Sequence, residues 1–283
     1  MMMASSSITT KEAEAESTMP NCLELPIDIT ANILSRLDTI DIVKSVCLVC
    51  PLWWNFFKDP LKWHSIHMTN FTSLSSITFS ELAKICCYAV ERSRGHLLDI
   101  EIRSFGNDDV LQSIAQNGSS LRRLWIVSCL RITDKAFCEA LRKLPLLEEL
   151  NISPCHISKN FLEVIGISCP LLKSLKFDRR WCLIHRCPYD HEAFIISETM
   201  SRLCHLDIKG NGLTAVGLVA ILDKCPLLEY LDIRDCYSLS LTLSESLKKR
   251  CIEQIKDLQL PVMNNYEDFD YLDFDNDFYD PYD

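Results

Sequence analysis

The sequence predicts an α/β solenoid preceded by a small all-α module, and three observations support this fold class. A leucine pattern recurs at intervals close to 25 residues from Leu97 onward. Inside each unit the apolar spacing changes from every second residue, as in a strand, to the spacing of a helix. The residues before the repeats lack this period but carry apolar side chains at helical spacing.

Residues 21–70 are expected to form the helical module, after a disordered, polar segment at residues 1–20. Pro26 can begin a first helix, Asp38 or Thr39 can cap a second, and an aromatic-rich third follows. The apolar positions of the first two helices are Ile29, Ile33, Leu34, Leu37, Ile42, Val43 and Val46. Because three short helices cannot bury this much apolar surface, we expect a partner protein to cover part of it.

The repeat domain is expected over residues 71–263. Written as L-x-x-L-x-I, seven units follow one another at steps of 24, 26, 25, 31, 25 and 27 residues, which is the length of leucine-rich repeats with one insertion. The units begin at Leu97, Leu121, Leu147, Leu172, Leu203, Leu228 and Ile255. Pro145, Pro170 and Pro226 follow helical halves and turn the chain into the next strand, because proline cannot continue a helix.

A small residue recurs three positions after the last strand residue of a unit. These residues are Cys129, Cys155 and Cys236, with Asn211 in the same slot of another unit. The stretches CPLLEYLDIRDC and SCLRITDKAF resemble the cysteine-containing subclass of leucine-rich repeats. A small side chain that can bond backbone groups suits the tight corner at this point.

The helical module resembles the F-box, through the stretch LELPIDITANILSRLDTIDIVKSVCLVCPLWW and the Asp59-Pro60 and Trp63 that follow it. With the repeats, the chain resembles a plant-type F-box/LRR-repeat protein. The family commonly has a polar residue where this chain has Pro51, which is harmless in the first turn of the third helix and would bend the helix if it lay deeper.

This resemblance implies a non-catalytic substrate-recognition subunit of an SCF-type (Skp-cullin-F-box) E3 ubiquitin ligase, located in the nucleus or the cytoplasm. The F-box would bind a Skp-type adaptor, and through it cullin and RING subunits. The repeats would bind a target protein for ubiquitin-dependent proteasomal degradation. A protein-binding scaffold outside any ligase is the alternative. The resemblance assigns adaptor binding to Leu25, Pro26, Ile29, Ile33, Leu34, Leu37, Val46, Val49 and Trp53.

The substrate is expected on the concave side of the solenoid, where strand residues between the core leucines point. One row of such residues is Glu101, Trp125, Asn151, Lys176, Asp207, Asp232 and Gln259. The next row is Arg103, Val127, Ser153, Asp178, Lys209 and Arg234. The charges in these rows can form a recognition patch or a ladder that solvates the sheet. Trp125 can anchor a ligand or pack on a neighbouring loop.

Composition excludes several other classes of function. Seven glycines and the absence of phosphate-loop motifs argue against nucleotide enzymes. Most of the net charge of −10 lies in the acidic, aromatic tail at residues 264–283, which we expect to be disordered. This tail either is solvated or docks on a basic surface. The nearly neutral remainder argues against nucleic-acid binding. Without an apolar leader or a long apolar run, the fifteen cysteines indicate a soluble chain in a reducing compartment, away from membranes.

One cysteine- and histidine-rich segment is a candidate metal site, formed by Cys182, His185, Cys187 and His191. Its spacing matches no standard zinc motif, so we expect no metal and no cofactor. No second histidine completes H-E-x-x-H after His191, and no G-x-S-x-G occurs, so we expect no catalytic residues.

Overall fold

A computed structural model describes residues 26–69, 77–153, 161–178 and 189–261 of the chain. The chain forms two compact units, the first ending at Leu37 and the second beginning at Asp38. In the first unit, helix α1 spans Ile27–Leu34. Pro26 stands directly before this helix, where a missing N–H costs nothing, as the sequence predicted.

The second unit begins with a helical segment that continues to Trp63. Asp38 caps its start, since its carboxylate accepts a hydrogen bond from the backbone N–H of Ile40. The elements are α2 (Thr39–Asp41), a π-helical turn η1 (Ile42–Val46), α3 (Cys47–Val49), α4 (Pro51–Phe56) and a 3₁₀ turn η2 (Pro60–Trp63). Pro51 lies in the first turn of α4, so it does not bend the helix.

The same unit contains one sheet of eight parallel strands, which pair in sequence order. The strands are β1 (Ser65–Met68), β2 (Asp99–Arg103), β3 (Arg123–Val127), β4 (Glu149–Ser153), β5 (Ser174–Lys176), β6 (His205–Asp207), β7 (Tyr230–Asp232) and β8 (Asp257–Gln259). This sheet and its helices form the predicted leucine-rich-repeat solenoid. The strands β2 to β8 correspond to the seven predicted units.

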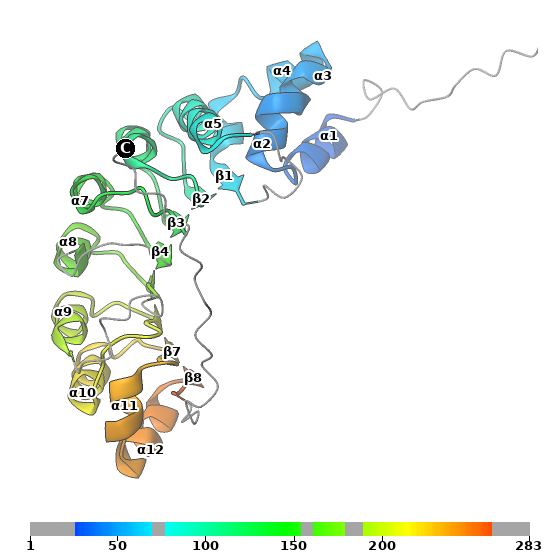
Figure 1. Cartoon of the computed structure of the whole chain (residues 1–283). Coiled ribbons are helices and arrows are strands. Elements are labelled where there is room, and N and C mark those ends of the chain that lie inside the picture. The colour runs from blue at the N-terminus through cyan, green and yellow to red at the C-terminus, as the bar shows by residue number, and fades with distance from the viewer. Residues whose placement is uncertain (1–25, 70–76, 154–160, 179–188, 262–283) are drawn as a thin grey trace, which may run out of the picture. The chain divides into compact units, whose positions relative to one another are not determined.

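A helix follows each strand and returns the chain to the next, with a second short helix before β8. These helices are α5 (Phe79–Arg92), α6 (Asp108–Asn117), α7 (Asp134–Leu141), α8 (Phe161–Ser168), α9 (His191–Thr199), α10 (Ala215–Lys224), α11 (Tyr237–Thr242) and α12 (Glu245–Gln254). Helices α5 to α12 lie on the outer side of the arc and the strands on the inner side (Figure 1). The core lies between the two layers, where the leucines of the repeat are buried.

Strand β1 is an eighth unit that the leucine pattern did not predict. Its register pairs Ile66 with Ile100 and Met68 with Ile102, and both Ile66 and Met68 are fully buried. The sheet therefore starts inside the range 21–70 that the sequence analysis assigned to the helical module. The pattern missed it because the strand carries isoleucine and methionine in place of the recurring leucines.

The corner after each strand explains the recurring small residue. Ser128 directly follows β3, and Asp235 comes shortly after β7. Their φ angles are positive, 56° and 61°. The next residue, Cys129 or Cys236, is buried, and the Sγ of Cys236 donates a hydrogen bond to the carbonyl of Ile208, 3.4 Å away. Cys155, in the corresponding slot of another unit, lies outside the described residues.

Candidate functional site

The concave face has the register that the sequence predicted. Backbone pairing aligns Glu101 with Trp125, Trp125 with Asn151, and so on along the sheet. The full row is His67, Glu101, Trp125, Asn151, Lys176, Asp207, Asp232 and Gln259. From His67 to Asp232, the residues on either side of each row member are buried apolar residues, mostly leucine and isoleucine, so this row faces away from the helices.

Charged side chains form one ladder at the β1–β3 end of this face. Asp99 accepts a hydrogen bond of 2.7 Å from the Nε of Arg123 and lies 3.0 Å from the Nε2 of His67. The hydrogen bond that the His67 ring donates to Asp99 raises the pKa of His67, although burial opposes the shift. Burial raises the pKa of Asp99, but the bonds from Arg123 and His67 outweigh it and hold that pKa well below its usual range. Arg103, a predicted substrate residue, pairs with Glu101 at 2.8 Å.

A second ladder crosses β5 to β7. The Nζ of Lys209 lies 3.1 Å from a carboxylate oxygen of Asp207 and 2.8 Å from one of Asp232. Lys176 pairs with Asp207 at 3.2 Å, and Arg234 pairs with Asp232 at 2.7 Å. Burial raises the pKa of Asp232, yet the bonds from Arg234 and Lys209 bring it down to about 2.

These pairs fit the interpretation of the predicted charges as a ladder. Asp207 and Asp232 are buried, so their carboxylates mainly hold the neighbouring cations in place. Lys176 and Arg234 keep 39% and 47% of their side chains exposed. The contribution of these residues to substrate binding stays a prediction.

A third concave row was missing from the sequence analysis. It comprises Ser65, Asp99, Arg123, Glu149, Ser174, His205, Tyr230 and Asp257. His205 and Tyr230 stack face to face, with ring centroids 3.8 Å apart. The Arg123 guanidinium lies over the ring of Trp125, 5.5 Å from its centroid. The alternation of strand side chains would have revealed the row if it had been extended by one residue before each strand leucine.

The residues assigned to adaptor binding divide between the two units. In the first unit, Pro26 before α1 and Ile29 and Ile33 on α1 are exposed, Leu34 is buried, and Leu37 after the helix is half-buried. In the second unit, Val49 is exposed, Trp53 is half-buried and Val46 is buried. Leu25 lies outside the described residues.

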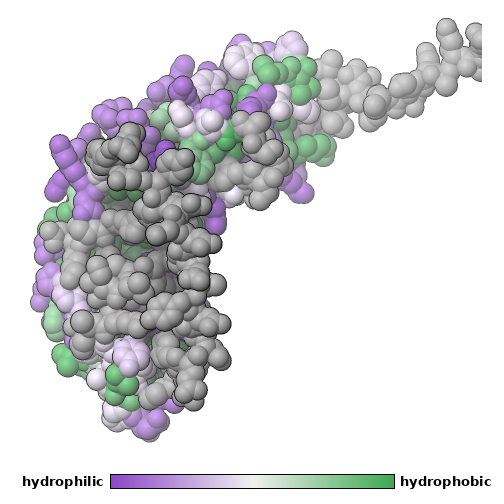
Figure 2. All heavy atoms as spheres, in the orientation of Figure 1, coloured by the Kyte–Doolittle hydropathy of each residue, from purple (hydrophilic) through white to green (hydrophobic). Residues whose placement is uncertain are grey.

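The largest exposed apolar side chain of α3 was not among the predicted adaptor residues. Leu48 is 78% exposed beside Val49, which is 53% exposed. Figure 2 shows hydrophobic residues at the surface in the part of the view that Figure 1 assigns to α3 and α4. The adjacent Trp53 has a buried indole N–H with no acceptor among the described residues. Helix α3 therefore presents apolar surface, and the adjacent α4 carries a buried N–H donor without an acceptor among the described residues.

Aromatic contacts join this helical segment to the first repeat within the second unit. Trp63 donates a 2.8 Å hydrogen bond to the carbonyl of Phe57, and their rings lie 5.6 Å apart. The ring of Tyr88 on α5 meets Trp63 edge-on at 6.2 Å. Arg92 on α5 donates a second hydrogen bond to Phe57. These contacts hold the end of α4 against α5 and so fix the position of the surface formed by α3 and α4.

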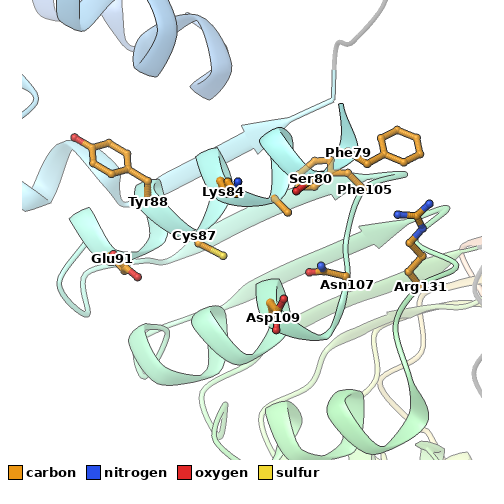
Figure 3. A pocket seen from close by; sticks show the side chains of 11 residues that line it. Phe79, Ser80, Lys84, Cys87, Tyr88, Glu91, Phe105, Asn107, Asp109 and Arg131 are labelled. Atoms are coloured by element: carbon orange, nitrogen blue, oxygen red, sulfur yellow. The ribbon is translucent and has the colours of Figure 1, made fainter. Parts of the chain in front are cut away.

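A pocket of about 480 Å³ lies between α5 and α6, on the helix side of the solenoid. Figure 3 shows side chains of both helices around the pocket, with Arg131 from the loop that follows β3. Its rim carries Lys84 and Arg131 but also Glu91 and Asp109. The balanced charges favour no particular class of ligand.

The candidate metal site lies mostly outside the described residues, and three buried cysteines of the repeats have raised thiol pKa values. Cys182, His185 and Cys187 lie outside the described part of the chain, and His191 begins α9. No group of three potential metal ligands occurs among the described residues. Burial raises the thiol pKa of Cys169 and Cys236 to about 12 and that of Cys225 to about 11, so these cysteines are poor nucleophiles. None of the described helices combines the length and apolar character needed to cross a membrane.

Comparisons with known proteins place the chain among plant relatives, although no family model matches it. It is 43% identical to F-box/LRR-repeat protein 23 of Arabidopsis thaliana over 85% of the chain, and it spans about half, 53%, of that relative. It is 41% identical to the Arabidopsis F-box protein SKIP19, over 99% of this chain and 89% of that one. F-box/LRR-repeat protein 22 of Arabidopsis is 39% identical, over 90% of this chain and 81% of the relative.

These relatives match the chain across both its helical N-terminal segment and its repeats. The fold described above has the same two parts, a helical segment followed by a leucine-rich solenoid. The chain belongs to the plant F-box/LRR-repeat protein family.

Proposed function

We propose that this chain is the substrate-recognition subunit of an SCF-type E3 ubiquitin ligase. Its F-box binds a Skp-type adaptor, which links it to cullin and RING subunits, and its repeats hold a target protein for ubiquitination and proteasomal degradation. The observation that carries the proposal is the exposed apolar pair Leu48 and Val49 on α3, inside the segment that resembles the F-box.

The energetics of this surface favour a protein partner. Fully covering a side chain such as leucine or valine yields about 1.5 to 3 kcal/mol relative to leaving it in water. In the first unit, Ile29 and Ile33 on α1 are themselves 45% and 44% exposed. An acceptor from the adaptor would satisfy the buried indole N–H of Trp53, which has no acceptor within the described part of the chain; a buried donor without an acceptor costs free energy.

The role needs no chemistry from the chain itself. Ubiquitin transfer would belong to the RING-bound machinery, and the repeats would supply affinity and position. A curved solenoid offers a long concave surface for a protein segment, which suits a specificity subunit. We infer that the chain acts in the nucleus or the cytoplasm, where the ligase subunits operate and where free thiols such as those of this chain persist.

A pull-down with matched variants tests the adaptor interaction. The full chain is passed over an immobilised Skp-type adaptor, and the double variant Leu48→Glu/Val49→Glu is expected to bind at least 10-fold more weakly, since two charges would have to be desolvated in the interface. Ile167→Glu is the control, because Ile167 on α8 is 78% exposed, as Leu48 is. Retention of the double variant equal to that of the wild type would contradict the proposed contact.

If the wild-type chain itself is not retained at micromolar concentration, the chain acts outside a ligase and the proposal is wrong. A second readout addresses substrate capture. Proximity labelling in cells is expected to recover more of the target proteins with the Leu48→Glu/Val49→Glu variant than with the wild type, because captured targets escape degradation. Equal recovery would count against a degradative role.

A further inference from the structure

We propose that the concave face from β3 to β7 binds an extended segment of a protein substrate that carries lysine or arginine side chains. The cationic groups would pair with acceptors that β4 and β6 present, at Glu149, Asn151 and Asp207. This inference rests on the proposed function, because it names the chemical class of the substrate that the repeats would capture.

The first argument is the balance of charge partners on this face. Every lysine and arginine in its described rows already has a carboxylate partner: Arg103 with Glu101, Arg123 with Asp99, Lys176 with Asp207, and Lys209 and Arg234 with Asp232. Glu149 is half-buried in the same rows and forms no ion pair among the described residues. Among the described residues of this face, each cation therefore has a carboxylate partner within 4 Å, whereas Glu149 has no ion pair of its own and is only attracted by Arg123 on the neighbouring strand.

Two buried acceptor atoms point to the same chemistry. One oxygen of Asp207 and the side-chain oxygen of Asn151 are buried without a hydrogen-bond donor among the described residues. Asp207 is only 2% exposed, and its position between the buried Leu206 and Ile208 aims its side chain at the concave side. A buried acceptor without a donor costs free energy, and an ammonium, guanidinium or amide group of a ligand would recover it.

Aromatic side chains flank these acceptors on both sides. Trp125 lies on β3, next to Asn151 on β4. The stacked rings of His205 and Tyr230 lie on β6 and β7, in the row beside Asp207. Aromatic rings bind the aliphatic parts and the cationic ends of lysine and arginine well. Neighbouring strands lie about 4.8 Å apart, so β3 and β6 are about 14 Å apart, a distance that roughly four residues of extended chain span.

A peptide selection tests this inference. The full chain, alone and bound to a Skp-type adaptor, is screened against a positional-scanning library of nine-residue peptides. We expect lysine or arginine to be enriched, and aspartate and glutamate to be depleted, at one or more positions. Selection of acidic or purely apolar peptides, or binding of no peptide at all, would overturn the inference.

Matched variants locate the site. We expect Glu149→Gln/Asn151→Leu to weaken binding of the selected peptide at least 10-fold, and Glu163→Gln, on the exposed side of α8, to leave it unchanged. Replacing the selected lysine by norleucine, or arginine by citrulline, must weaken binding to the wild-type chain by a similar factor. This change is made in the peptide, so its effect does not depend on how a protein variant folds. If the double variant or the neutral peptide binds as before, the inference is wrong.

The outcomes separate this inference from the proposed function. Selection of basic peptides by a chain that does not bind the adaptor would support the concave site and refute the ligase role. Adaptor binding by a chain that selects no basic peptide would support the ligase role and refute the concave site.

Discussion

At the scale of single residues, the charges on the concave face build the surface on which a substrate would lie. Asp232 is fully buried and receives hydrogen bonds from Arg234 and Lys209. A buried carboxylate is tolerated only when it is paired and hydrogen-bonded. The ladder therefore fixes the positions of Lys209 and Arg234 and makes the surface rigid before anything binds.

The ladder at β1 to β3 makes stability depend on pH through His67. The hydrogen bond with Asp99 raises the pKa of His67 in the folded chain. The charged histidine therefore contributes stability that is fully present below its unfolded pKa, near 6.5, and is lost as pH rises through the raised folded value.

We expect the difference in the free energy of unfolding between the wild type and His67→Gln to be larger at pH 5.5 than at pH 8.5. Urea unfolding at both pH values measures it, with His96→Gln as a control, because His96 is exposed. A difference that is the same at both pH values would show that the pair with Asp99 adds no stability to the charged form.

Residue positions on the sheet were predictable, but their burial was not. The alternation of strand side chains predicted the row that contains Trp125, Asn151 and Asp207, because one residue of slip would have put a charge in the core. The near-complete burial of Asp207 depends on cations from two other positions, Lys176 and Lys209. These contacts between strands leave no periodic signal in the sequence.

At the scale of elements, local sequence signals set most helix starts. Asp38, Thr133 and Ser244 each accept a hydrogen bond from the first turn of the helix they precede. Pro51 fits the first turn of α4, where proline is preferred. The π-helical turn η1 was not predicted, since its residues have ordinary helical spacing. Strand β1 was missed because four residues without a leucine pattern are too short to identify.

The capping box of α5 gives a prediction for one element. The Thr78 hydroxyl accepts from the backbone N–H of Glu81, and the Glu81 carboxylate accepts from the backbone N–H of Thr78 at 2.8 Å. We expect Thr78→Ala to lower the free energy of unfolding by about 1 kcal/mol, the usual cost of losing such a cap.

Chemical denaturation measures this loss. Ser80→Ala is the control, because Ser80 is exposed in the first turn of the same helix and caps nothing. If both variants lose the same stability, the cap is not what holds the start of α5.

At the scale of the whole molecule, the repeats and the helical segment after Leu37 belong to one compact unit. Trp63, Phe57 and Arg92 connect α4 to the first repeat, and β1 extends the sheet toward that segment. The sequence predicts a domain boundary at residue 70, because the repeat period does not extend before it. Composition could not reveal that the aromatic side chains on either side pack together.

The apolar surface of the helical segment and the concave face of the repeats suit two different kinds of partner. Exposed apolar side chains on α3 suit a constant partner, since apolar contacts are strong but not selective for charge. The concave rows carry charges and aromatic rings, which suit discrimination among substrates. This arrangement is what a specificity subunit requires.

The most direct test of the ligase role is assembly of the purified full-length chain with its proposed partners. The chain, a Skp-type adaptor and a cullin are mixed and analysed by size-exclusion chromatography with multi-angle light scattering. We expect the chain and the adaptor to form a 1:1 complex, and the cullin to join the chain only when the adaptor is present. Separate elution of the chain and the adaptor at micromolar concentration would contradict the account.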